Sequence, residues 1–110
     1  MRQVELARSL LGVKWLHQGR DAAVGIDCVG LLLLAFEIPS EDEPTVYGRS
    51  AYGHLMDGRL RHHLGEPVTD MRPGDAVLMG FGDGGLARHV GLLADSLYGG
   101  LSIIHTDSIV

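Results

Sequence analysis

The run from Val29 to Phe36 reads VGLLLLAF and carries no polar side chain, which limits the fold more than any other feature of the chain. A helix over residues 28–37 is therefore apolar nearly all round, and a helix of that kind is buried. Asp27, directly before it, is a favoured N-cap residue. The run of eight residues is too short to span a bilayer. We therefore expect this helix to pack against a sheet inside a globular domain, with no membrane partner.

The rest of the first half predicts two further helices and the loops that join them. A stripe of apolar residues predicts a helix over residues 3–11, which Gly12 ends. Residues 12–26 lack periodicity and are expected to form a loop. The acidic segment 38–50, which contains two prolines, is expected to form a solvated loop. A weaker helix pattern covers residues 51–64, which include two glycines.

The second half has the pattern of strands and turns. Strands are predicted at Ala76–Phe81, Arg88–Ala94 and Leu101–His105, separated by a Gly-rich hairpin loop and by a turn at Leu97–Gly100. Strands joined in this way form an antiparallel meander. We therefore predict an α+β fold with a single domain over residues 1–110, in which N-terminal helices pack on the meander.

Composition and charge exclude several classes of function. The net charge of −5 argues against nucleic acid as the partner, because phosphate binding needs a basic face. A single cysteine cannot form an internal disulfide. The N-terminal segment is interrupted by Arg2, Glu5 and Arg8 and lacks the form of a signal peptide. We therefore expect synthesis in the cytoplasm, with another carrier if the protein acts outside.

Neither a cofactor nor a metal site is predicted. The glycines form no dinucleotide-binding GxGxxG and no phosphate-binding loop with its lysine, and we interpret them as turns. His62 and His63 are adjacent, and neighbouring residues on a helix point about 100° apart, so one ion seldom binds both.

Cys28 is a candidate nucleophile because it is the only cysteine and stands at the start of the apolar helix. The unpaired amides and positive dipole end of a helix N-terminus favour the thiolate. His89 and His105 have the parity to share one face of neighbouring strands. If the helix packs on that face, His89 would accept the thiol proton, and His105 would orient the His89 ring through a hydrogen bond. Asp107 is a second candidate for orienting His89. The alternative is a buried cysteine that acts only as a small core residue.

Four motifs, in order along residues 5–107, resemble the NlpC/P60 cysteine peptidases, which are papain-like. Gly25–Leu32 (GIDCVGLL) resembles the D-C-S/V-G-L nucleophile motif, and Arg88–Leu92 (RHVGL) resembles the H-V-G-I base motif. Pro73–Val77 (PGDAV) resembles the P-G-D-L turn and strand between them. The loop Gly12–Arg20, with its WLHQGR stretch, is similar to the phage and prophage branch of the family.

The resemblance implies a papain-like fold with the nucleophile at the N-terminus of a buried helix. It also implies hydrolysis of bacterial peptidoglycan stem peptides, typically at D-γ-glutamyl-diaminopimelate bonds. The phage branch implies an enzyme that a phage or gene-transfer-agent tail carries to the cell wall or periplasm for DNA delivery. Tail hub or tip proteins would then be its partners.

The resemblance also implies residue roles. Cys28, His89 and His105 are the catalytic candidates, and the Cys28 backbone N–H is the oxyanion donor. The Trp15 position lines the site, where other members use a tyrosine hydroxyl. We place Trp15, His17, Gln18 and Asp27 at the substrate site, with loop hydrogen bonding as the alternative for His17 and Gln18.

The chain departs from the family pattern in two places. Val29 replaces the commoner serine after the nucleophile, and the chain stops at Val110, whereas family domains continue with another strand. We therefore expect either a domain truncated at its C-terminus or a partner that completes the sheet. Two further functions stay open: a tail-tip assembly module with incidental catalysis, and a thiol-dependent amidase or acyltransferase.

Arg20 and Asp21 could bind a charged peptide terminus, but exposure on the surface is the default expectation for both.

Overall fold

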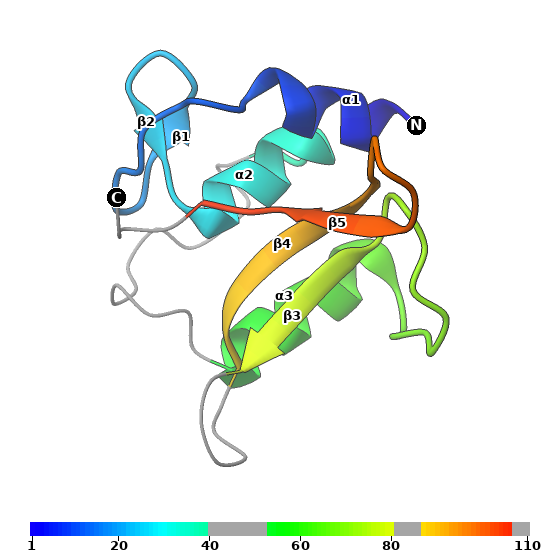
Figure 1. Ribbon diagram of the computed structural model, residues 1–110. Helices are drawn as coiled ribbons and strands as arrows, with labels where there is room; N and C mark the ends of the chain where they lie inside the picture. Colours follow the sequence, from blue (N-terminus) through cyan, green and yellow to red (C-terminus); the bar gives the residue numbers. More distant parts are fainter. Residues whose placement is uncertain (40–52, 81–86, 107–110) are drawn as a thin grey trace.

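A computed structural model describes residues 1–39, 53–80 and 87–106 of the chain (Figure 1). The helices and strands follow in the order α1 (Arg2–Ser9), β1 (Arg20–Asp21), β2 (Gly25–Ile26), α2 (Cys28–Ala35), α3 (Gly53–Leu64), β3 (Ala76–Gly80), β4 (Ala87–Asp95) and β5 (Leu101–Ile104). Helices thus precede the main sheet, and the predicted α+β class is confirmed. The acidic cluster 41–43, the glycine-rich segment 81–86 and Asp107 lie outside the described residues.

The main sheet is antiparallel and has the strand order β3-β4-β5. Its register pairs Leu78 with Val90 on one side of β4 and Leu92 with Ile104 on the other. The predicted meander is therefore confirmed, with strand ends within one or two residues of those expected. Because β4 is central, β3 pairs with its first part, up to Leu92, and β5 pairs with its last part, Leu92–Asp95.

Helix α2 is the centre of the hydrophobic core, as its all-round apolarity predicted. Leu31, Leu32 and Ala35 are buried, and they cluster with Val90 and Leu92 of β4. Helix α1 lies beside α2 and adds Val4 and Ala7 to the same cluster, so both N-terminal helices cover one face of the sheet (Figure 1). No helix in the described ranges has the length and apolarity needed to cross a membrane.

The two N-terminal helices are shorter at their C-terminal ends than predicted. Helix α2 ends at Ala35 because Glu37 adopts a left-handed conformation with φ of 56°. The N–H of Ile38 donates to the carbonyl of Leu33 at 2.9 Å. That pattern is typical of a helix C-cap. Helix α1 ends at Ser9, and the chain turns before Gly12.

The prediction of an unstructured loop over residues 12–26 is wrong in part. Strands β1 and β2 form a short antiparallel ribbon that pairs Arg20 with Ile26. Asp21 builds its turn, since its carbonyl accepts from the N–H of Val24 at 3.0 Å and its carboxylate from the N–H of Ala23 at 2.9 Å. Two-residue strands are too short to show a sequence period, which is why the pattern did not reveal them.

The ribbon touches α2 at a point where only glycine fits. A Cβ atom added at Gly30 would lie 2.1 Å from the carbonyl oxygen of Gly19. A Cβ atom added at Gly19 would lie 2.2 Å from the carbonyl oxygen of Gly25. The backbone of the loop therefore rests directly on the first turn of the buried helix.

We expect Gly30→Ala to lower the free energy of unfolding by about 1–3 kcal/mol, because the methyl group must push the loop off the helix. Urea denaturation followed by circular dichroism measures this. Gly58→Ala is the matched control, since an added Cβ there meets no atom within 4 Å and a helical alanine is favoured over glycine. Equal effects of the two substitutions would contradict the packing argument.

Candidate active site

The buried carboxylate of Asp27 organises the start of α2. Its Oδ1 accepts from the N–H of Gly30 at 2.8 Å, as the sequence predicted for an N-cap. The same oxygen accepts from the Arg20 guanidinium at 2.8 Å, and Oδ2 accepts from the N–H of Gln18 at 2.9 Å. One side chain thus joins the helix, the ribbon and the preceding loop.

These contacts correct two expectations about charged residues. Asp27 is only 4% exposed and its carboxylate oxygens accept hydrogen bonds from within the chain, so the structure gives it a positioning role, and its contact with substrate stays a prediction. Arg20 is also largely buried, which contradicts the default of surface exposure. The sequence carried no local signal for this pair, because Arg20 is brought beside Asp27 by its pairing with Ile26 across the ribbon, which only the fold shows.

The loop that holds Trp15, His17 and Gln18 is fastened to the segment before Cys28. The N–H of Leu16 donates to the carbonyl of Ile26, and the N–H of Ile26 donates to the carbonyl of Lys14, both at 3.0 Å. The Trp15 and His17 rings stack with centroids 6.2 Å apart. The structure thus brings this loop to the N-terminus of α2. Substrate contact by its three side chains stays a prediction.

Cys28 is the first residue of α2 and its side chain is half-buried. Burial raises the pKa of its thiol above the ordinary value, and the nearby Asp27 carboxylate adds to the rise. Backbone donors at Val90, Val29 and Cys28 itself lower the pKa of the thiol and so oppose this rise. The amide donors at the helix N-terminus therefore favour the thiolate, as expected, but desolvation outweighs them and the net pKa is raised.

His89 and His105 are in direct contact. The Nε2 atom of His89 lies 3.0 Å from the Nδ1 atom of His105, and the two rings meet edge to face at 84°. His89 stands near the start of β4, and His105 directly follows the last residue of β5. The predicted proximity of these two imidazoles is confirmed.

The predicted packing of the helix on the histidine face is wrong. Helix α2 packs on the face that carries Val90, Leu92 and Ala94, whereas strand alternation places His89 on the other face. Cys28 is instead one of the half-buried residues that pack against the core cluster containing Val90. Val90 directly follows His89 in β4.

No set of three or more His, Cys, Asp or Glu side chains that could hold a metal ion occurs in the described part of the chain. The rings of His62 and His63 lie edge to face with centroids 4.8 Å apart, and His63 also contacts Arg59.

Comparison of the chain with protein-family models, with curated proteins and with solved structures gives no match. The geometry of the site and the sequence motifs therefore carry the functional argument.

We expect Asp27→Asn to lower the free energy of unfolding by about 3 kcal/mol, because asparagine keeps the helix cap but leaves the buried Arg20 charge without its carboxylate. Urea denaturation at neutral pH measures the loss. The control is Asp70→Asn, which removes an exposed contact 3.7 Å from Arg72 and should cost below about 1 kcal/mol. A loss at Asp27 as small as that at Asp70 would contradict a structural role for the buried pair.

The raised pKa of Cys28 makes its alkylation depend on pH in a defined direction. Only the thiolate reacts, so the rate with iodoacetamide should rise with pH and reach its midpoint above the value of about 8.5 for free cysteine. The same chain unfolded in urea is the control and should titrate at the ordinary value. A folded-state midpoint below that of the unfolded chain would show that amide donors outweigh burial.

Proposed function

We propose that the chain is a cysteine peptidase of the NlpC/P60 type with a papain-like arrangement of its site. The observation that carries the proposal is the contact between His89 and His105, on strands whose core cluster Cys28 packs against at the start of a buried helix. A nucleophile, a base and an orienter in this sequence are the parts that acyl transfer needs.

The histidine contact determines which ring nitrogen would serve the thiol. Because Nε2 of His89 faces His105, Nδ1 is the nitrogen that would accept the Cys28 proton. Proton transfer and attack would occur together, since burial favours the neutral thiol at rest. The sulfur would bond to the scissile carbonyl carbon, and the imidazolium would return the proton to the departing amine. Water would then hydrolyse the thioester, give its proton to His89 and release the acid and the thiol.

The start of α2 supplies donors for the developing oxyanion. The N–H of Gly30 is used by the Asp27 cap and the N–H of Leu31 by the Asp27 carbonyl. Neither of these two bonds uses the N–H of Cys28. We assign the oxyanion position to the Cys28 N–H, with the Trp15 indole as a neighbouring donor on the loop.

The substrate class rests on the sequence motifs. The resemblance to the phage and prophage branch supports peptidoglycan stem peptides as substrate, D-γ-glutamyl-diaminopimelate bonds as the target and a tail particle as carrier.

Digestion of purified sacculi tests the proposal. We expect Cys28→Ala and His89→Ala each to lower the release of stem-peptide fragments at least about 10³-fold, because each removes a group that enters the bond-making step. His105→Ala should cost less, since orientation is partly recoverable, and His105→Asn should restore part of that loss. Released fragments are quantified by mass spectrometry.

The control is His62→Ala, which changes an exposed residue of α3. This variant should release fragments at the wild-type rate. Unchanged release by both Cys28→Ala and His89→Ala, with wild-type folding by circular dichroism, would rule out the proposed chemistry. Labelling of Cys28 by a small acyl donor without digestion of sacculi would favour the acyltransferase alternative.

A further inference from the structure

Strand β5 forms one border of the main sheet. It pairs with β4 on its inner side, and within the described residues no strand pairs with its outer side (Figure 1). Leu101, Ser102 and Ile103 are exposed, so their side chains are accessible to another molecule. The backbone N–H and C=O groups along such an edge are a template for another strand.

This edge lacks the features that normally prevent pairing. Proteins protect edge strands with charged residues, prolines or bulges. The strand reads LSII and contains neither a charge nor a proline, and its register with β4 is regular over all four pairs. The opposite border strand, β3, differs because its register is irregular between Met79 and Gly80.

The strand is also complementary to itself. Leu101 and Ile103 lie on one face and are 43% and 38% exposed. A twofold axis through Ser102 would place Leu101 of one copy opposite Ile103 of the partner subunit, in antiparallel pairing. Apolar cross-strand pairs of this kind stabilise a sheet, and here both pairs would be apolar.

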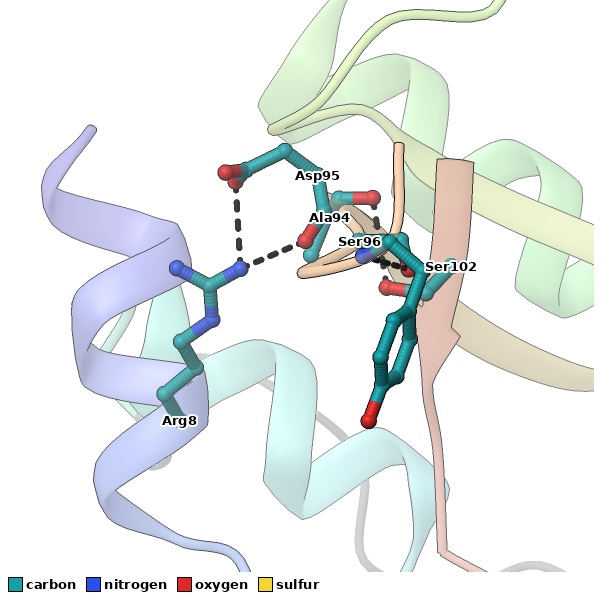
Figure 2. A network of polar contacts seen from close by, with 6 residues as sticks. Arg8, Ala94, Asp95, Ser96 and Ser102 are labelled. Atoms are coloured by element: carbon teal, nitrogen blue, oxygen red, sulfur yellow. Dashed lines mark hydrogen bonds and ion pairs between the residues drawn. The ribbon is translucent and has the colours of Figure 1, made fainter. Parts of the chain in front are cut away.

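The turn that leads into β5 extends this apolar surface. Leu97 and Tyr98 are 95% and 97% exposed. The turn is nonetheless well held, since the Arg8 guanidinium donates to the carbonyl of Asp95 at 2.7 Å and to its carboxylate (Figure 2). Next to the turn, a hollow of about 310 Å³ lies between Arg8 and Leu11 at the end of α1 and the residues of β5. Exposed apolar side chains gathered at one edge indicate a protein contact.

We propose that two copies of the chain associate through β5, which pairs antiparallel with β5 of the second copy about a twofold axis at Ser102. The three strands of each copy then form one continuous sheet, and the turn residues Leu97 and Tyr98 flank the junction. We assign the pairing strand to a second copy because Leu101 and Ile103 would each meet an apolar residue of the other copy. The edge also carries no charge that would attract a partner of opposite sign. This inference is independent of the proposed peptidase activity.

Light scattering on a size-exclusion column tests the association. At about 100 μM the wild-type chain should elute with twice its 11.8 kDa mass and dissociate on dilution. Ile103→Lys adds a charge to the edge and should weaken association at least about tenfold. Val24→Lys is the matched control, because it replaces another exposed apolar residue, in the turn between β1 and β2, and should leave the dimer intact.

A covalent test checks the position of the axis. In a Cys28→Ala background, Ser102→Cys should form a disulfide-linked dimer under mild oxidation, because residues on the axis face one another at a separation that a disulfide spans. Ser9→Cys, exposed on α1, should not.

Circular dichroism and thermal melting confirm that each variant is folded. A wild-type chain that stays monomeric at every concentration would overturn the proposal and leave the edge for a strand of another protein. Assemblies larger than two copies, or equal dimerisation of Ile103→Lys and wild type, would also overturn it.

Discussion

The buried carboxylate of Asp27 is the interaction on which the rest of the site depends. It caps α2, neutralises Arg20 and holds the backbone of Gln18, so three segments of the chain meet at one side chain. A buried charge is tolerated only when its oxygens have donors and a counter-charge is close, and both conditions hold here. Cys28 is the next residue, and its position at the helix start follows from this cap. Part of the sequence pattern around the cysteine therefore has a structural purpose.

Close backbone contact also fastens the loop to the first turn of α2, in addition to the Asp27 carboxylate. Gly30 lets the carbonyl of Gly19 reach the first turn of α2, at a distance that no side chain would allow. The loop bearing Trp15 and His17 is thereby held against α2 instead of projecting into solvent. Asp27, Arg20 and the two glycines thus build the site, and the chemistry that we propose falls to Cys28 and to the histidines of the sheet.

The two faces of the main sheet carry different kinds of side chain. One face of β4 carries Val90 and Leu92 into the core beneath α2, and the other carries His89 toward His105. Cys28 packs against the core cluster that contains Val90, the residue next to His89. The same construction leaves β5 as a regular border strand, which is why one short element both presents His105 and offers an edge for association.

The sequence by itself determined the α+β class, the buried helix with its Asp27 cap, the meander and the pairing of His89 with His105. Each of these follows from local periodicity, capping chemistry or strand parity, which act over a few residues. Only the tertiary structure decided which sheet face α2 covers, that Arg20 is buried against Asp27 and that burial raises the pKa of Cys28. Those outcomes depend on how segments distant in sequence exclude water from one another, and desolvation is a property of the packed molecule rather than of any local pattern.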